Sequence, residues 1–312
     1  MDRLNIFTST GSKLIHHPGV VSLLRYERKG APVSLQVAPT SRCNLNCVFC
    51  SNANRDKHED LGLESIVDLV SNLRSLKTIE WTGGGDPTMY GQINEAIRLC
   101  SEGGLQQGMI TNGVAFTENI TRESMARLHW IRISMNCLDY IHDVDLPFDF
   151  HGALGFSYVI NERTTQDVLM RLHEHVAKYH PSYVRVVPNC QASNEQQEEN
   201  NTKLSKLVEE WGYPYFYQPK RFNLPFACYW GYFKPFVLHD GWAYPCSSVV
   251  LNTTSDKSFH SMFRWVRMED LPGVYDKMIV PLPIKNCDHC VFSSQNNMVH
   301  DILNPSGMEN FI

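Results

Sequence analysis

Three closely spaced cysteines constrain this chain more than any other feature of its sequence. Cys43, Cys47 and Cys50 are separated by three residues and then by two. Spacing of this kind is typical of a loop that wraps an iron–sulfur cluster, whereas a structural zinc site usually presents two Cys-x-x-Cys pairs. Three thiolates can bind three irons of a cubic [4Fe–4S] cluster, which leaves the fourth iron open to a small molecule. The alternatives are a zinc knuckle or a chance spacing.

Strand-like and helix-like segments alternate from about residue 33 to residue 217. Six segments are predicted to be strands: 34–38, 78–82, 108–111, 130–135, 155–160 and 183–187. Helical patterns occupy 63–76, 92–101, 120–128, 165–179 and 195–211, whereas 138–150 predicts a loop. Such units form parallel sheets with right-handed crossovers. Six units are too few to close an eight-stranded barrel, so the sequence predicts an α/β fold with an open, partial (β/α)6 TIM-like barrel.

The composition changes beyond residue 217, which predicts a second, smaller domain. Segment 218–283 is rich in Pro, Tyr, Phe and Trp and contains short strand-like pieces. Asp240-Gly241 stands between two β-prone arms and predicts a hairpin over 236–244. We therefore expect three parts: an N-terminal leader or cap over 1–32, the partial barrel over 33–217, and a small C-terminal α+β domain over 218–312.

Charge, hydropathy and cysteine content restrict the class of protein. The formal net charge is −5 and no long run of Lys and Arg is present, which argues against duplex nucleic acid as a partner. The sequence shows no secretory leader and no apolar stretch near 18 residues, which predicts a protein that is neither exported nor membrane-spanning. The 10 cysteines then indicate a reducing compartment. We expect a cytoplasmic protein.

The first cysteine group resembles the hallmark of the radical S-adenosylmethionine (radical SAM) superfamily, Cys-x-x-x-Cys-x-aromatic-Cys after the first barrel strand. Cys43, Cys47, Phe49 and Cys50 match it position for position. The resemblance implies that the open iron binds SAM, that an electron cleaves SAM to a 5′-deoxyadenosyl radical, and that this radical abstracts a hydrogen atom from substrate. It also implies an external reductant such as flavodoxin or ferredoxin. Phe49 would contact adenine or pack within the loop.

A glycine triplet follows the second predicted strand. Gly83, Gly84 and Gly85 allow the backbone to approach a ligand closely. Together with Asp86 they resemble the Gly-Gly-Glu-Pro motif of the family, whose carbonyls hold the amino group of SAM. Asp86 stands where the family usually has Glu, so its shorter side chain does not carry over the same contact. The alternative is a tight strand-to-helix turn.

Three further strand ends resemble SAM-binding positions. Asn112 belongs to a Thr-Asn-Gly sequence after the third strand. Arg132 and Ser134 belong to a segment on the fourth strand that resembles the family segment that reaches the carboxylate and ribose of SAM. Strand alternation places both side chains on one face. A buried arginine needs an anion, which a SAM carboxylate, a substrate carboxylate or a salt bridge at the barrel rim would supply. At the end of the sixth strand, Val187 and Pro188 are candidates to pack against adenine.

Four of the remaining cysteines fall in the C-terminal region: Cys228, Cys246, Cys287 and Cys290. The order of two single cysteines and a closing Cys-x-x-Cys pair resembles the Twitch extension of radical SAM dehydrogenases and the related SPASM domains. The resemblance implies an auxiliary [4Fe–4S] cluster with full cysteine ligation. A structural zinc ion held by the same four thiolates is the alternative.

A fully ligated cluster most simply transfers electrons. The first hypothesis is therefore oxidation of a small polar substrate (a small molecule, peptide or nucleotide), with the auxiliary cluster as electron acceptor. A second is a redox-neutral isomerisation or epimerisation. A third is a metal-stabilised binding protein without turnover.

Polar residues after the fourth strand and on the sixth strand are candidates for catalysis. Asp143 and Asp145 lie among several acids in the predicted loop, and Arg185 lies on the sixth strand. Cys137 and Cys190 follow strand ends, where a hydrogen donor or a substrate link could lie.

Overall fold

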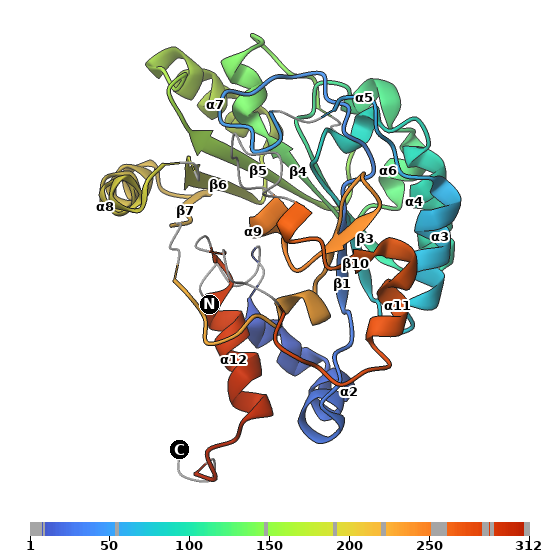
Figure 1. Ribbon diagram of the computed structural model, residues 1–312. Coiled ribbons are helices and arrows are strands. Elements are labelled where there is room, and N and C mark those ends of the chain that lie inside the picture. Colours follow the sequence, from blue (N-terminus) through green and yellow to red (C-terminus); the bar gives the residue numbers. More distant parts are fainter. Residues whose placement is uncertain are drawn as a thin grey trace.

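The computed structural model describes residues 8, 10–53, 56–146, 149–189, 192–219, 223–250, 261–282, 287 and 290–308. Its centre is a ten-stranded sheet in the order β10-β9-β8-β1-β2-β3-β4-β5-β6-β7 (Figure 1). Seven consecutive strands are parallel: β1 (Ser34–Val37), β2 (Thr78–Trp81), β3 (Gln106–Thr111), β4 (Trp130–Ser134), β5 (Ala153–Ile160), β6 (Tyr183–Pro188) and β7 (Tyr215–Tyr217). The predicted partial barrel is confirmed, and β7 adds a seventh parallel strand to the six predicted.

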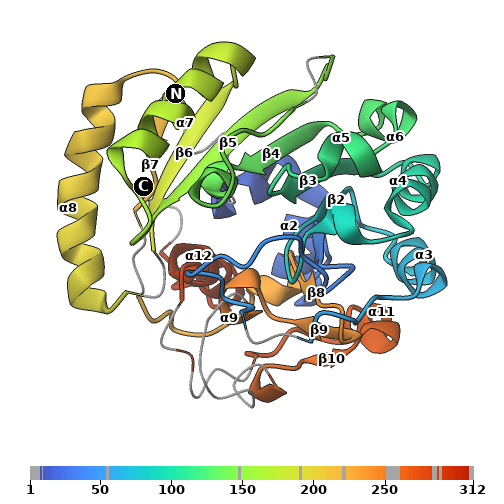
Figure 2. The same cartoon turned by 90° about the horizontal axis from the view of Figure 1, so that it is seen from above.

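Helices cover the outside of the curved sheet (Figure 2). They are α3 (Leu63–Asn72), α4 (Ile93–Glu102), α5 (Phe116–Asn119), α6 (Arg122–Ala126), α7 (Gln166–Tyr179) and α8 (Asn194–Trp211). The helix predicted over 120–128 is present as α6 but is shorter, because Thr121 adopts extended backbone and its side chain accepts from Ser124 N, so that the helix begins at Arg122. The short helix α5 before it was not predicted. After β4 the chain forms the 3-10 helix η4 (Met135–Asp139) and then an irregular loop in the described residues 140–146 and 149–150, as predicted.

The C-terminal strands extend the same sheet. β8 (Phe236–Val237) and β9 (Trp242–Tyr244) form the predicted antiparallel hairpin, which β10 (Val266–Arg267) continues. β8 also pairs with β1 in parallel, so β1 lies between β2 and β8. The remaining elements are short apart from α12: η5 (Trp230–Tyr232), α9 (Ser247–Val250), η6 (Met268–Asp270), α11 (Leu271–Val274) and α12 (Ser293–Leu303). None of the helices within the described ranges is long and apolar enough to cross a bilayer.

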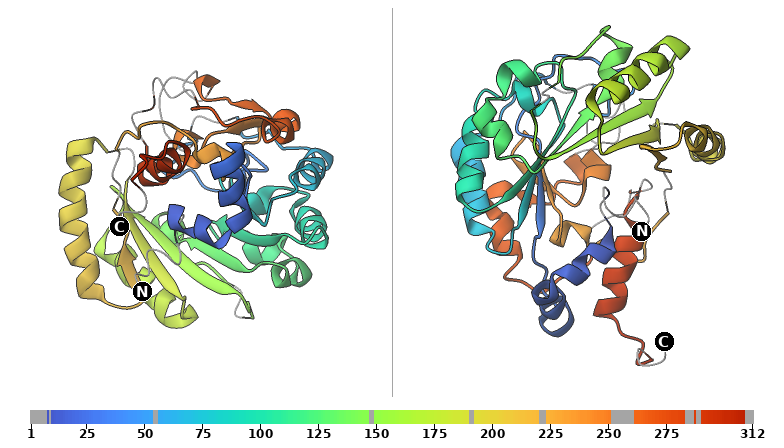
Figure 3. Two further views of the ribbon diagram at one scale, coloured as in Figure 1. Left: turned by 90° about the horizontal axis from the view of Figure 1, so that it is seen from below. Right: turned by 180° about the vertical axis from the view of Figure 1, so that it is seen from behind.

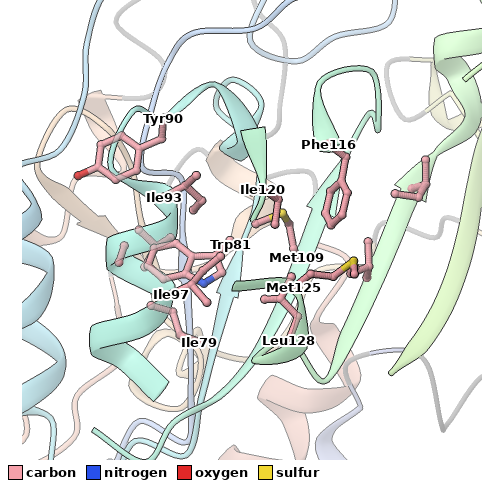
Figure 4. Close-up of a cluster of buried hydrophobic side chains, with 14 of the residues drawn as sticks. Ile79, Trp81, Tyr90, Ile93, Ile97, Met109, Phe116, Ile120, Met125 and Leu128 are labelled. Atoms are coloured by element: carbon pink, nitrogen blue, oxygen red, sulfur yellow. The ribbon is translucent and has the colours of Figure 1, made fainter. Parts of the chain in front are cut away.

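Two apolar clusters stabilise the molecule. The larger lies between the parallel strands and the outer helices, where Ile79, Trp81 and Met109 pack beneath α4, α5 and α6 (Figure 4). The smaller joins the two ends of the chain, because Leu14 and Leu24 pack with C-terminal residues.

The two ends of the chain therefore share one core. The N-terminal elements are η1 (Gly11–His16), α2 (Pro18–Ser22) and η2 (Leu23–Glu27). α12 packs against η1 and η2 (Figure 3). The boundaries 1–32, 33–217 and 218–312 remain a prediction.

Strand alternation gives the barrel a polar interior. Ile131 and Ile133 are fully buried toward the helices, whereas Arg132 and Ser134 lie half-buried on the other face, as predicted. Gly155 on the inner face of β5 has no room for a side chain, because a Cβ atom there would overlap the Tyr183 ring.

A buried ion pair links this interior to the C-terminal region. Lys234 Nζ lies 2.5 Å from Glu80 Oε1, and Gln36 Nε2 donates to Glu80 Oε2 at 3.0 Å. Burial alone would raise the pKa of Glu80, but the Lys234 charge and the donated hydrogen bonds outweigh burial and hold it below its ordinary value. The carboxylate is therefore charged in the folded protein.

We predict that Gly155→Ala destabilises the protein by about 1–3 kcal/mol, because the Tyr183 ring must move. Gly91→Ala is the matched control, because nothing lies within 4 Å of its Cβ position. Urea unfolding measures both. Equal stabilities of the two variants would contradict the close packing of β5 and β6.

Lys234→Met should cost about 3–5 kcal/mol at pH 7, because it leaves the Glu80 carboxylate buried without its counter-ion. Adding Glu80→Gln should restore most of that loss. The folded-state pKa of Glu80 is lowered, so its contribution is present above its unfolded pKa of about 4.3 and is lost as pH falls through the folded value. Denaturant unfolding at pH 7 and near pH 3 tests both statements. A Lys234→Met protein as stable as wild type at pH 7 would contradict this pair.

Candidate functional site

The first cysteine group lies on the loop that follows β1. Cys43, Cys47 and Cys50 are all half-buried, and Cys50 N donates to the Cys47 carbonyl at 3.0 Å. The loop is also held from outside, because Val48 N donates to the Tyr140 hydroxyl at 2.7 Å. Sequence reasoning missed Tyr140, which lies just after η4 and carries no motif.

The glycine triplet packs directly on the start of this loop. A Cβ atom at Gly85 would overlap the backbone of Ser41 and Arg42, so only glycine fits there. Asp86 N then donates to the Arg42 carbonyl at 2.7 Å. On the other side, a Cβ atom at Gly84 would lie 2.9 Å from the His239 ring.

The Asp86 carboxylate ties together the ends of β2 and β3. It is 3% exposed and accepts from Thr88 N (3.0 Å) and Thr88 Oγ1 (2.7 Å) at the start of the 3-10 helix η3 (Pro87–Met89). From the loop after β3 it accepts from Thr111 Oγ1 (2.8 Å) and Asn112 N (2.7 Å). Both carboxylate oxygens thus accept hydrogen bonds from the protein, and the side chain joins the loop after β2 to the loop after β3.

Asn112 reaches from this link to the cysteine loop. Its side-chain Nδ2 donates to Asn44 Oδ1 at 2.7 Å and lies 3.7 Å from Cys43 Sγ, within hydrogen-bond range for sulfur. The side chain is 9% exposed. The structure therefore brings the cysteine loop, the glycine triplet, Asp86 and Asn112 into direct contact at the carboxyl ends of the first three strands.

The other predicted SAM positions lie on β4 and β6. Ser134 is half-buried at the end of β4, and Val187 and Pro188 are buried at the end of β6. Phe49 is half-buried within the cysteine loop. All four positions lie at or beyond strand carboxyl ends, the side of a parallel barrel where ligands bind.

The predicted catalytic residues are not brought together. Arg185 lies inside the barrel on β6, whereas Asp143 and Asp145 are exposed. Asp143 lies 2.8 Å from His175 Nε2 on the outer helix α7. Burial alone would raise the pKa of Asp143, but the contributions of His175, the Val144 backbone and Lys178 together outweigh burial and lower the pKa.

Asp139, at the end of η4, accepts more hydrogen bonds from side chains than Asp143 or Asp145 does in the described structure. It accepts hydrogen bonds from Asn136, Tyr158 and Asn161 at 2.7–3.0 Å. Cys137 beside it is 1% exposed, and burial raises its pKa to about 12. Cys190, the other predicted hydrogen donor, lies outside the described residues.

The second cysteine group converges on one apolar cavity. Cys228, Cys246, Cys287 and Cys290 all line it, with Trp230 among the surrounding rings. Burial raises the pKa of Cys246 to about 12, and burial followed by the neighbouring thiols raises that of Cys228 well above 9. Within the described ranges no three His, Cys, Asp or Glu side chains form a set that could hold a single metal ion. The metal assignment therefore depends on the shared cavity and on the chemistry of four thiols, which need a cation to be charged there.

Asn296 of α12 fastens the two halves of this cavity. Its Oδ1 accepts from Tyr229 N (2.6 Å) and Trp230 N (2.9 Å), next to Cys228. Its Nδ2 donates to the Phe292 carbonyl (3.0 Å) and lies 3.9 Å from Cys290 Sγ. Sequence reasoning missed Asn296, because a lone asparagine on a helix carries no motif.

Comparison with known proteins agrees with this geometry. The sequence pattern described as "Radical SAM superfamily" matches residues 37–186, which contain the cysteine loop, strands β2 to β5 and most of β6. A radical SAM domain therefore accounts for this segment of the chain. Members of this superfamily use a [4Fe–4S] cluster and SAM.

Two curated relatives match parts of this chain. A tungsten-containing aldehyde ferredoxin oxidoreductase cofactor-modifying protein from Pyrococcus furiosus is 33% identical over 89 residues, which is 27% of this chain and 25% of the relative. A PqqA peptide cyclase from Xanthomonas oryzae is 25% identical over 179 residues, 52% of this chain and 45% of the relative. The chain thus spans less than half the length of either relative.

Among solved structures, SuiB from Streptococcus suis, bound to S-adenosylmethionine, is similar in fold. The TM-score is 0.55 at 14% sequence identity, with coverage of 88% of this chain and 73% of SuiB. At this identity the likeness concerns the fold alone. It extends beyond the radical SAM segment because it covers most of the chain.

We predict that Asp86→Asn lowers the free energy of unfolding by about 1–3 kcal/mol. An amide NH2 replaces one acceptor oxygen and leaves a buried donor among Thr88, Thr111 and Asn112 unsatisfied. Asp68→Asn on the exposed face of α3 is the control. If urea unfolding gives the same loss for both variants, the linking role of Asp86 is refuted.

Proposed function

We propose that this protein reductively cleaves SAM at a cluster held by Cys43, Cys47 and Cys50 and uses the radical to abstract a hydrogen atom from a small polar substrate in the barrel. The observation that carries the proposal is the contact of Asn112 with Cys43 Sγ, because it joins the SAM-type loops to the cysteine loop. When bound, the reduced cluster supplies the electron that cleaves SAM to the 5′-deoxyadenosyl radical.

The chain's own residues would hold and orient SAM around that cluster. Gly83, Gly84 and Gly85 would offer backbone carbonyls to its amino group, and Gly85 is packed against the cysteine loop. The Asp86 carboxylate is engaged by Thr88, Thr111 and Asn112, so we assign it to positioning these loops.

The remaining SAM contacts would come from the ends of β4 and β6. Ser134, with Arg132 below it, would reach the carboxylate and ribose, whereas Val187, Pro188 and Phe49 would pack around adenine. The burial of Val187 and Pro188 at the carboxyl end of β6 supports that role.

We propose that Cys228, Cys246, Cys287 and Cys290 hold an auxiliary [4Fe–4S] cluster. The shared apolar cavity supports this proposal, because it brings four cysteine sulfurs together where a cluster would supply the positive charge that buried thiolates need. Asn296 would orient Cys290 and donate toward its sulfur, as Asn112 does toward Cys43. Donors of this kind tune the potential of a cluster. With all its irons ligated by the protein, this cluster would accept the electron that substrate oxidation releases.

The relatives support a broad class of substrate and not a particular compound. The name PqqA peptide cyclase supports a peptide or a small molecule as substrate. Oxidation with the auxiliary cluster as acceptor is the reaction we favour, and a redox-neutral isomerisation is the alternative. Asp139, held by three donors near the carboxyl ends of β4 and β5, joins Asp143 and Asp145 as a candidate group for proton transfer, with Arg185 as a candidate contact to the substrate. An external reductant and a cytoplasmic location complete the proposal.

Removal of individual cysteines tests this function. Anaerobically reconstituted wild type, reduced with dithionite, should release 5′-deoxyadenosine from SAM and bind about eight irons per chain. Cys43→Ala should lose about four irons and 5′-deoxyadenosine release. Cys290→Ala should lose irons at the second site only. Cys100→Ala in the core of α4 is the control and should retain both properties.

SAM cleavage that survives Cys43→Ala would exclude the proposed function. Once a substrate is found, the product mass separates the two reactions. A loss of about two hydrogens indicates oxidation, whereas an isobaric product indicates isomerisation.

A further inference from the structure

Two arginines on the inner face of the barrel stand close to the path of a substrate. Arg132 on β4 and Arg185 on β6 alternate with fully buried apolar residues that face the outer helices. They flank β5, where Gly155 pairs in register with Arg132 and Ser157 with Arg185. A glycine covered by the Tyr183 ring and a small hydroxyl residue therefore separate the two arginines along the wall.

Neither guanidinium has the partner that its burial requires. The Nε atoms of Arg132 and Arg185 are inaccessible and make no hydrogen bond. Arg185 Nη1 donates to the neutral amide oxygen of Gln218 at 3.1 Å. Arg132 lies over the Trp130 ring, with Cζ 5.9 Å from its centroid. In the described part of the chain no carboxylate lies within salt-bridge distance of either arginine.

The acid on the opposite wall is already neutralised. Glu80 attracts Arg132 electrostatically, but its carboxylate is in contact with Lys234 at 2.5 Å. Among these side chains, three cations therefore face one carboxylate. Burial, and then the charge of Arg132, lower the pKa of Arg185 to about 9. A guanidinium is ordinarily charged at any physiological pH, so this shift reflects a missing counter-charge.

We propose that Arg185, assisted by Arg132, binds an anionic group of the substrate, a carboxylate or a phosphate, deep inside the barrel. This inference rests on the proposed function, because it assigns two side chains of the barrel to the substrate of that reaction. An anion placed there would satisfy both Nε–H donors and offset the excess positive charge. Arg–carboxylate and Arg–phosphate hydrogen bonds are among the strongest that proteins make.

Depth in the barrel separates this group from the SAM carboxylate. Arg185 lies three residues before the end of β6, or about 10 Å along the strand. The cysteine loop, the glycine triplet and Asn112 all lie beyond strand ends. We therefore assign Arg185 to the substrate, whereas Arg132, two residues before the end of β4, lies between the two ligands.

Bromide is a suitable probe because its anomalous scattering locates an anion directly. Crystals of the anaerobic, cluster-loaded protein would be grown with and without SAM and soaked in sodium bromide. We expect an anomalous peak within hydrogen-bond distance of Arg185 Nε in both crystals. Arg185→Gln should abolish the peak and Arg132→Gln should weaken it. Arg163→Gln, at an exposed arginine over Tyr140, is the matched control and should retain it.

Three outcomes would overturn the assignment. A wild-type structure without bromide at Arg185 would remove the anion site, and this arm decides even if Arg185→Gln fails to fold. A peak that disappears when SAM is present would assign the site to the SAM carboxylate. A peak that persists in Arg185→Gln would be an adventitious ion only.

The bromide experiment needs no turnover, so its failure is distinct from failure of the proposed function. A bromide at Arg185 in a wild-type protein that releases no 5′-deoxyadenosine would leave the anion site standing and remove the radical reaction. SAM cleavage by a protein without the bromide peak would support the radical reaction and remove the anion site.

Discussion

The buried carboxylate of Asp86 is the interaction on which the candidate site depends. It accepts from Thr88 on its own loop and from Thr111 and Asn112 on the next, so it fixes the ends of β2 and β3 relative to each other. Asn112, held in this way, extends to Cys43. A side chain one methylene longer would have to reorganise this network, which gives a physical reason for aspartate at this position. One carboxylate that is not in hydrogen-bond contact with a cysteine thus helps to position the cysteine loop.

The two cysteine groups are supported in similar ways. In each group a buried asparagine forms hydrogen bonds next to a cysteine and directs its side-chain NH2 toward a cysteine sulfur. Asn112 is directed toward Cys43, and Asn296 is directed toward Cys290. Asn296 also joins the chain at Cys228 to the chain at Cys290, which are far apart in sequence. The two asparagine side chains therefore help to fix the positions of the cysteine side chains on these loops.

Much of this arrangement could be predicted from the sequence, and the failures have physical causes. Cysteine spacing and strand alternation identified the cysteine loop, the hairpin and the inward direction of Arg132 and Ser134, because both patterns are local. The grouping of Asp143 and Asp145 with Arg185 did not appear, since composition cannot tell which side of a loop an acid faces. Asn296 and Tyr140 act through contacts distant in sequence. β7 is only three residues long, too short for a clear pattern.

The position of β1 has a mechanical consequence. The backbone of β1 pairs with β2 on one edge and with β8 on the other. The cysteine loop follows β1, and the hairpin that leads to Cys246 begins with β8, so the two cysteine groups are attached to neighbouring strands. Sliding one against the other would break a ladder of peptide hydrogen bonds. The shared sheet therefore fixes the separation between the two cysteine groups, on which the rate of the proposed electron transfer would depend.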